Sequence, residues 1–224
     1  MQKLESLNKN IISCKKCIRL VKFREKIAKI KRKEFLKQQY WGKAVPGFGD
    51  IKAKLLIIGL APAAHGANRT GRVFTGDRSA SFLFKCLKKA NFSNKCDSKS
   101  IDDGLEIYNT YITCAIKCVP PGDKPNAQEL KNCLKFLDKE MQQLKELEVI
   151  LTLGKVAFES CLKFFSLNKR DYKFKHGTFY KLKNKIWIVA CYHPSPRNVN
   201  TKRIDEKKML LVLNSIKRKI KPHQ

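Results

Sequence analysis

A glycine-rich polar loop that directly follows a short apolar run is the feature that most restricts the fold of this chain. The apolar run, residues 55–58, has the length and branching of a strand buried on both faces of a sheet. The loop, residues 59–79, holds four glycines, three arginines, a histidine and an aspartate. Glycines let a backbone approach a ligand closely, and ligands of open α/β sheets bind at the carboxyl ends of strands. The loop therefore predicts a binding site at that edge of a sheet.

A second polar segment follows another apolar run near the end of the chain. Residues 193–198 (His-Pro-Ser-Pro-Arg-Asn) come after the apolar residues 186–190. Because the carboxyl ends of parallel strands meet at one edge, we expect the two polar loops to converge on one pocket.

The remaining pattern alternates apolar runs with helical periodicity, which favours a parallel sheet covered on both faces. Residues 174–183 are compatible with a short hairpin or edge piece. We expect one α/β domain over residues 1–224, with a central, mainly parallel four-stranded sheet and an N-terminal helical extension over about residues 1–50. The expected strands are 54–59, 108–116, 149–153 and 186–191, and the expected helices are 4–12, 18–39, 79–90, 127–147, 154–165 and 205–220.

The net charge of +29, from 48 basic and 19 acidic residues, predicts a polyanionic partner, most commonly nucleic acid. A lysine bias in a genome rich in A and T, ribosomal association or anionic lipid would suit the charge as well. No apolar run has the length of a membrane span, and the first residues lack a signal-peptide pattern. We therefore expect an intracellular, cytoplasmic protein located with the nucleoid.

Nine cysteines in a reducing compartment are not expected to form disulfides. Cys14 and Cys17 have the spacing of a metal-binding pair, and Cys118 and Cys133 bracket a turn and a helix start. Asn126 and Glu129 predict a capping box at that start. The four thiolates can close one site, for zinc or for an iron–sulfur cluster. The cysteines expected to be buried without such a role are Cys86, Cys114, Cys161 and Cys191.

With both loops and the cysteine pairs in view, the chain resembles the iron–sulfur uracil-DNA glycosylases, and among them the fifth type. The segments that carry the resemblance are 40–42, 45–50, 59–79, 117–122 and 193–195. The resemblance implies a three-layer α/β/α fold. It also implies a monomer with a [4Fe–4S] cluster held by Cys14, Cys17, Cys118 and Cys133.

Members of that family flip a deaminated base out of DNA and hydrolyse its N-glycosidic bond, which leaves an abasic site. The resemblance assigns His193 to a hydrogen bond on the departing base, Asp77 to the sugar or water, and Phe74 to stacking on the base. Each residue also has a structural alternative: a strand-end cap for His193, a helix cap for Asp77 and core packing for Phe74.

Further site residues also follow from the resemblance. Three positions depart from related patterns: Leu60 is apolar, Cys114 stands where the uracil-specific type has Asn, and Asp123 replaces an expected Asn. Uracil, hypoxanthine, xanthine and ethenocytosine all remain candidate substrates, and Asp77 or His65 would have to replace the missing polar group at Leu60, unless unactivated water traps the sugar cation. The predicted base-binding residues are Gly59, Ala61, Phe74 and Cys114, and the predicted DNA contacts are Arg69, Arg72, Asp123, Ser195, Arg197 and Asn198.

Two other functions compete with a glycosylase. The first is a non-catalytic nucleic-acid-binding protein stapled by zinc or a cluster. The second is a nucleotide-binding α/β enzyme, which is disfavoured because no Walker or dinucleotide-binding fingerprint follows any expected strand.

Overall fold

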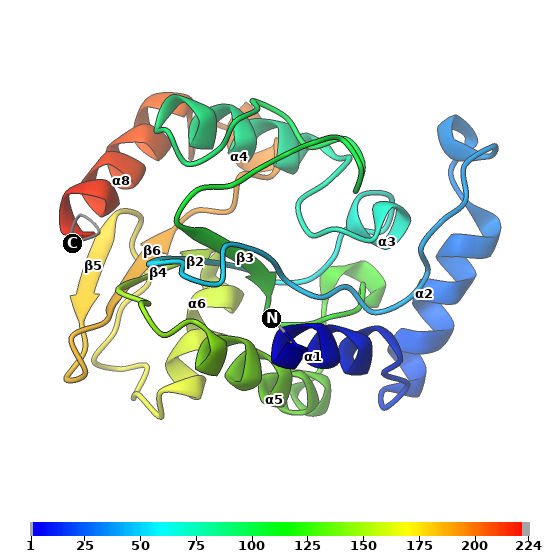
Figure 1. Ribbon diagram of the computed structural model, residues 1–224, viewed down its shortest axis with the longest axis horizontal. Coiled ribbons are helices and arrows are strands. Elements are labelled where there is room, and N and C mark those ends of the chain that lie inside the picture. Colours follow the sequence, from blue (N-terminus) through cyan, green and yellow to red (C-terminus); the bar gives the residue numbers. More distant parts are fainter. Residues whose placement is uncertain (1, 221–224) are drawn as a thin grey trace.

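The sheet has six strands in the order β1-β3-β2-β4-β6-β5 in the computed structural model, which describes residues 2–220 (Figure 1). The four central strands are parallel, and β1 and β5 pair antiparallel with its two sides. The strands are β1 (Phe48–Gly49), β2 (Leu55–Gly59), β3 (Thr110–Cys114), β4 (Val149–Leu153), β5 (Thr178–Lys181) and β6 (Trp187–Cys191).

The four predicted strands are the four parallel ones, but the prediction that they make up the whole sheet was wrong. The missing strands lie at the edges, where burial on one side only leaves a weaker sequence pattern. β1 is two residues long and ends at Gly49, whose φ is 130°. β5 lies within the segment that is compatible with an edge piece, and its residues are partly exposed.

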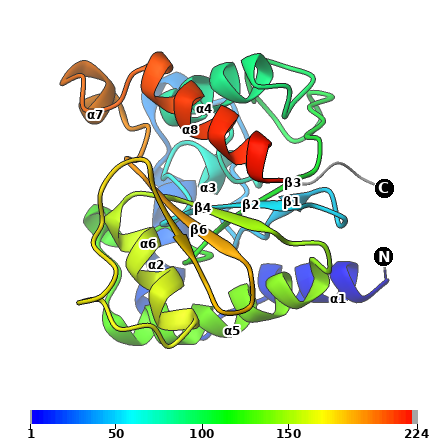
Figure 2. The ribbon, with the colours of Figure 1, turned by 90° about the vertical axis from the view of Figure 1, so that its left-hand side faces the viewer.

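Helices cover both faces of the sheet, which confirms the three-layer arrangement. α4 and α8 lie on one face, and α1, α5 and α6 lie on the other (Figures 1 and 2). The helices are α1 (Gln2–Ile12), α2 (Ile18–Ile30), α3 (Ala67–Thr70), α4 (Arg78–Lys89), α5 (Ala127–Gln143), α6 (Lys155–Phe164), α7 (Pro196–Asn200) and α8 (Glu206–Lys219).

The apolar strand sequences follow from this burial. Side chains alternate between faces along a strand, so a strand covered on both sides needs apolar residues throughout. In β2, Leu55 and Ile57 join the core under α4 and α8, whereas Leu56 and Ile58 join the core under α5 and α6. All four side chains are fully buried.

The helix predicted over residues 18–39 ends at Ile30, so that prediction was too long. Lys31 has a φ of 60°, a left-handed conformation that stops the helix, and a short 3-10 turn follows over Lys33–Phe35. Phe35 continues the apolar periodicity, but its ring lies 4.0 Å from the guanidinium of Arg69 instead of facing the sheet. The short helices α3 and α7, both within the polar loops, were not predicted.

A buried ion pair joins α5 to the end of β3. Lys117 Nζ lies 2.5 Å from Glu140 Oε2, and the two side chains are 1% and 0% exposed. The same carboxylate oxygen accepts from the Thr113 hydroxyl at 2.9 Å, and Oε1 accepts from the backbone N–H of Gly47 at 2.9 Å. Glu140 therefore fixes α5, β3 and the segment before β1 relative to one another.

Within residues 2–220 we find no helix with the length and apolar character needed to cross a membrane.

We expect Lys117→Met to lower the free energy of unfolding by about 3 to 5 kcal/mol, because it leaves Glu140 as an unpaired buried charge. The double variant Lys117→Met/Glu140→Leu should recover most of that loss, since apolar pairs of similar volume replace buried ion pairs at little cost. Urea unfolding of the two variants and the wild type measures both effects. A double variant no more stable than Lys117→Met would contradict the assignment of the loss to the unpaired charge.

Candidate active site

A cavity of about 330 Å³ opens at the carboxyl ends of the parallel strands. The loops after β2, β3 and β6 all contribute to it, so the two polar loops of the sequence converge as expected. Its lining residues are Leu60, Ala61, Ala63, Phe74, Asp77, Ser79, Cys114, Asp123, His193, Ser195 and Pro196.

Phe74 forms an aromatic wall of this cavity and depends on a glycine. The ring lies over the end of β2, where a Cβ on Gly59 would come within 2.8 Å of two ring carbons. Phe74 itself has a φ of 48°, a conformation that costs free energy for a bulky residue and is concentrated at functional sites. Gly59 does not line the cavity but makes room for the ring that does.

Cys114 forms the floor beside Phe74. The parallel register places Cys114 opposite Gly59, and a Cβ there would lie 3.4 Å from the Cys114 sulfur. Burial raises the pKa of Cys114 to about 12, so the side chain is a neutral thiol at physiological pH. The floor of the cavity is therefore small, weakly polar and uncharged.

His193 stands opposite, with its ring centroid 6.1 Å from that of Phe74 and the two planes at 31°. Burial lowers the pKa of His193 to about 4, which keeps the imidazole neutral at physiological pH. In the part of the chain that the structure describes, no hydrogen-bond partner occupies either ring nitrogen. Its backbone carbonyl accepts from Asn198 Nδ2 at 2.8 Å, so α7 holds the residue in place.

Asp77 is the N-cap of α4, where its Oδ1 accepts from the backbone N–H of Ala80 at 2.9 Å. Burial raises the pKa of Asp77, and the backbone N–H groups of Ala80 and Ser79 together with Arg69 oppose that rise. A Cβ on Gly66 would clash with Oδ2. The structural alternative for Asp77 is thus observed, and the same carboxylate also lines the cavity.

The guanidinium of Arg69 stabilises the conformation of the loop. It donates to the carbonyls of His65 and Gly76 at 2.7 and 2.9 Å and to Gln38 Oε1 at 2.6 Å. His65 is not among the cavity residues, and its Nδ1 lies 3.0 Å from the Tyr40 hydroxyl. The loop arginine and histidine therefore hold residues 59–79 in shape.

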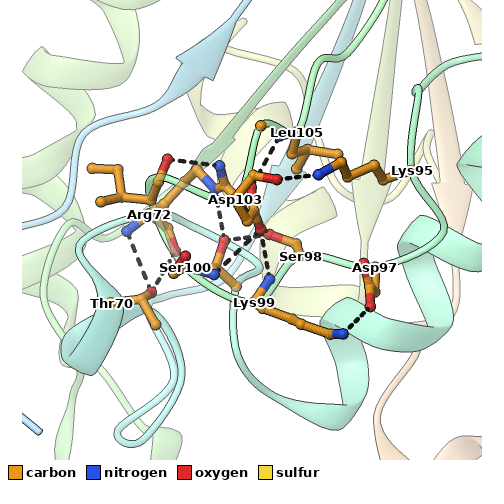
Figure 3. A network of polar contacts seen from close by, with 12 residues as sticks. Thr70, Arg72, Lys95, Asp97, Ser98, Lys99, Ser100, Asp103 and Leu105 are labelled. Carbon is orange, nitrogen blue, oxygen red and sulfur yellow. Dashed lines mark hydrogen bonds and ion pairs between the residues drawn. The ribbon is translucent and has the colours of Figure 1, made fainter.

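Arg72 is 6% exposed and lies in a network of polar contacts (Figure 3). It donates to Thr75, Ser98 and Asp103 at 3.0, 2.8 and 2.7 Å. Burial opposes the ionisation of Asp103, but Arg72 and backbone N–H groups outweigh it and lower the pKa of Asp103 to about 2. The DNA contact predicted for Arg72 conflicts with this position, because its donors are used inside the protein.

Other predicted DNA contacts lie at the mouth of the cavity. Asp123 and Ser195 line it, and the Ser195 hydroxyl also caps α7 by accepting from the Asn198 N–H at 3.3 Å. Arg197 is exposed on α7. The side-chain amide of Asn198 is bound to the carbonyl of His193, so the structure gives it a positioning role that the sequence did not suggest.

Two exposed cations at the mouth are absent from the predicted DNA contacts. Arg78 lies between the cavity residues Asp77 and Ser79, and Lys124 follows Asp123. The sequence signal that could have identified them is their position next to polar residues of the two loops. With Arg197, these residues are exposed cations that adjoin the lining residues of the cavity in sequence.

The structure also brings together the four cysteines predicted to share a site. Cys14 and Cys17 lie between α1 and α2, and with Cys133 on α5 they line a cavity of about 170 Å³. Cys118 and Cys133 lie in one buried apolar group against which Cys17 packs. The predicted capping box of α5 is present.

The residues around these thiols carry positive charge, which suits an anionic group. Among residues 2–220, no group of three or more His, Cys, Asp or Glu side chains is arranged to hold one metal ion. A cubane iron–sulfur cluster binds one thiolate at each iron, so its ligands stand farther apart. Lys16, Lys135 and Lys139 line the same cavity, and buried Arg24 donates to the Cys118 sulfur at 2.9 Å.

Comparison with known proteins shows the family of this chain. Residues 46–217 match the uracil DNA glycosylase superfamily. A type-5 uracil-DNA glycosylase of Thermus thermophilus is 42% identical over 96% of this chain and 97% of its own length. One of Pyrobaculum aerophilum is 43% identical over 91% of this chain and 87% of its own length. A type-4 enzyme of Sulfurisphaera tokodaii is 28% identical over 92% of this chain and 81% of its own length. The resemblance seen in the sequence is confirmed.

We expect one histidine Cε1–H resonance to titrate near pH 4 in NMR spectra, and His193→Asn to remove it. The unfolded pKa is about 6.5, so the free energy of unfolding should fall as the pH drops from about 6.5 to 4. His193→Asn should make this fall shallower. A His193 resonance that titrates near pH 6.5 would contradict a buried, neutral imidazole.

Proposed function

This chain belongs to the uracil-DNA glycosylase superfamily, and we propose that it is a DNA repair glycosylase that removes uracil from DNA. The enzyme flips the deaminated nucleotide out of the helix, hydrolyses its N-glycosidic bond and leaves an abasic site. The observation that carries the proposal is the cavity in which the imidazole of His193, without a hydrogen-bond partner among residues 2–220, faces the ring of Phe74.

The cavity suits a single flipped base. A base inside a duplex cannot be attacked at its glycosidic bond until it leaves the stack and enters such a pocket. The Phe74 ring offers a stacking surface, and the neutral thiol of Cys114 closes the floor without a charge to repel the base. Stacking on an aromatic ring tolerates different bases.

His193 stabilises the departing base. As the glycosidic bond breaks, negative charge develops on the base and collects on its carbonyl oxygens. A neutral imidazole can donate one N–H to such an oxygen, and a fixed donor aimed at developing charge stabilises the transition state more than the ground state. Asn198 fixes the donor in position by holding the His193 carbonyl.

Asp77 acts on the other side of the broken bond. The sugar becomes positively charged, and a carboxylate stabilises that cation or orients the attacking water. Oδ1 is held by the N-terminus of α4, which leaves Oδ2 for the substrate. Leu60, next to Gly59, has no polar group to share this work, and His65 lies outside the cavity.

The cavity also bears on substrate range. At the floor of the cavity, Cys114 stands in place of an amide side chain that could recognise the edge of uracil. Hypoxanthine, xanthine and ethenocytosine are therefore further proposed substrates. Asp123 places a carboxylate at the mouth, where it faces the incoming nucleotide. Arg78, Lys124 and Arg197 adjoin the lining residues in sequence and suit contacts to phosphate, so the proposed partner is DNA, bound by a single chain at the nucleoid.

We further propose that Cys14, Cys17, Cys118 and Cys133 hold a [4Fe–4S] cluster. When bound, the cluster cross-links the N-terminal segment to α5 and to the end of β3, and it takes no part in hydrolysis. The support is the shared position of the four thiols and the cations around them.

Single-turnover cleavage of duplexes that contain one uracil tests the proposed reaction. The wild type should yield alkali-labile abasic sites, and His193→Ala should slow their formation by about 10²- to 10³-fold, the effect of losing one aimed donor. A wild type that binds DNA but forms no abasic sites would support the non-catalytic alternative. Rates of His193→Ala close to wild type would overturn only the role of His193.

Asp77 has a matched control in Asp205, which caps α8 in the same way by accepting from the Lys208 N–H at 2.8 Å. Asp77→Ala and Asp205→Ala should each cost about 1 kcal/mol of stability through the lost cap. Only Asp77→Ala should lower the cleavage rate. Equal rates for the two variants would reduce Asp77 to a cap.

The cluster proposal predicts a brown protein that contains iron and acid-labile sulfide. Cys17→Ser should lower the iron content and bleach the visible absorption, whereas Cys96→Ser should not, since Cys96 is exposed and outside the thiol group. A fully folded, active wild type without iron or sulfide would contradict the cluster.

A further inference from the structure

Within the part of the chain that the structure describes, Arg24 is a buried cation without a carboxylate partner. Its side chain comes from α2, seven residues or about two turns beyond Cys17, and the residue is 2% exposed. Among residues 2–220 no Asp or Glu lies within ion-pair distance of its guanidinium. Its Nε is buried and has no hydrogen-bond partner in the same part of the chain.

Among the described residues, the hydrogen bonds of the Arg24 guanidinium all go to the thiol site. Nη1 donates to the Cys118 sulfur at 2.9 Å, and Nη2 donates to the backbone carbonyl of Cys14 at 3.1 Å. Cys118 lies after β3 and Cys14 lies before α2, so one guanidinium joins two separate segments of the site.

A buried guanidinium of this kind needs a negative charge nearby. Arginine stays protonated in proteins, so it cannot escape the cost of burial by losing its proton. A carbonyl oxygen satisfies its hydrogen bonds but does not neutralise its charge, and an uncompensated buried charge is strongly destabilising. The sulfur of Cys118 is in contact with it, and a thiol that binds a metal is deprotonated, so a metal-bound Cys118 would supply that charge.

We propose that Arg24 is the counter-ion and positioning residue of the iron–sulfur cluster. The inference rests on the cluster proposed above. Arg24 compensates the charge of the thiolates, donates an N–H to the sulfur of Cys118 and fixes the backbone of Cys14. Hydrogen bonds to cluster sulfurs and the net charge around a cluster set its reduction potential, so Arg24 raises that potential as well.

Arg24 also connects the cluster to the base cavity. Its backbone carbonyl accepts from Asn68 Nδ2 at 3.2 Å, and Asn68 lies in α3, inside the loop that carries Phe74 and Asp77. In Figure 1, α2 and α3 lie side by side. A cluster that holds Arg24 therefore also holds α2 against the loop of the active site.

The test compares Arg24→Gln and Arg24→Lys with Arg19→Gln. Arg19 is a matched control because it lies on the same helix and donates to the Glu129 carboxylate at 2.7 Å, not to sulfur. For each holoprotein, the measurements are iron and sulfide per chain, the rate of bleaching by an iron chelator, and the reduction potential of the cluster.

Arg24→Gln should release iron about 10- to 100-fold faster than the wild type, the usual effect of removing a group that supports metal ligands. Its reduction potential should fall, and Arg19→Gln should behave as the wild type in both measurements. Arg24→Lys keeps the charge but not the forked geometry, so it should assemble the cluster and release it at an intermediate rate.

The outcomes separate the two proposals. A wild type without iron and sulfide removes the cluster and this inference with it. A wild type that has the cluster, together with an Arg24→Gln variant of unchanged bleaching rate and potential, overturns the role of Arg24 alone. If Arg24→Gln does not fold, a wild-type bleaching rate in Arg24→Lys overturns it equally.

Discussion

Both sites of this protein depend on the buried ion pair and hydrogen bonds of the Glu140 carboxylate. It is fully buried, and it binds Lys117 and Thr113 of the β3 region and the backbone of Gly47. Thr113 precedes Cys114, the floor of the base cavity, and Lys117 precedes Cys118 of the thiol group. One charge at the centre of the molecule thus fixes the position of α5 and of both sites. A buried ion pair adds little net stability compared with apolar packing, but it tolerates few alternative arrangements.

Beyond that anchor, small residues decide the shape of the active site. Glycine at position 59 leaves room for the ring of Phe74, and glycine at position 66 leaves room for the carboxylate of Asp77. In both places a methyl group would meet the functional side chain itself. The glycine-rich loop therefore acts through the side chains that it admits, in addition to the backbone freedom that such loops usually provide.

Much of this arrangement could be predicted from the sequence because its signals are local. The parallel strands are continuous apolar runs, and the cap of α5 is a short-range pattern. The contacts that determine the roles of Arg69 and Arg72 include residues far away in the sequence. Both lie in a loop whose composition suggests phosphate contacts, yet Arg72 finds its partners at Ser98 and Asp103, in a segment without a sequence signature. β1 was missed for a different reason, because an edge strand buried on one side leaves a weak pattern, and the end of α2 follows from the left-handed backbone of Lys31.

The distribution of charge in the candidate active site suits the proposed reaction. The interior holds a neutral thiol and a neutral imidazole beside the carboxylate of Asp77, and exposed cations adjoin the lining residues in sequence. A cation inside the cavity would stabilise a base in the ground state as well as in the transition state, and would lose part of that effect to hydration. A neutral N–H donor in a desolvated pocket interacts weakly with a neutral carbonyl and strongly with an oxyanion. In the proposed reaction, the low pKa of His193 serves this purpose, because it keeps the imidazole an uncharged donor at physiological pH.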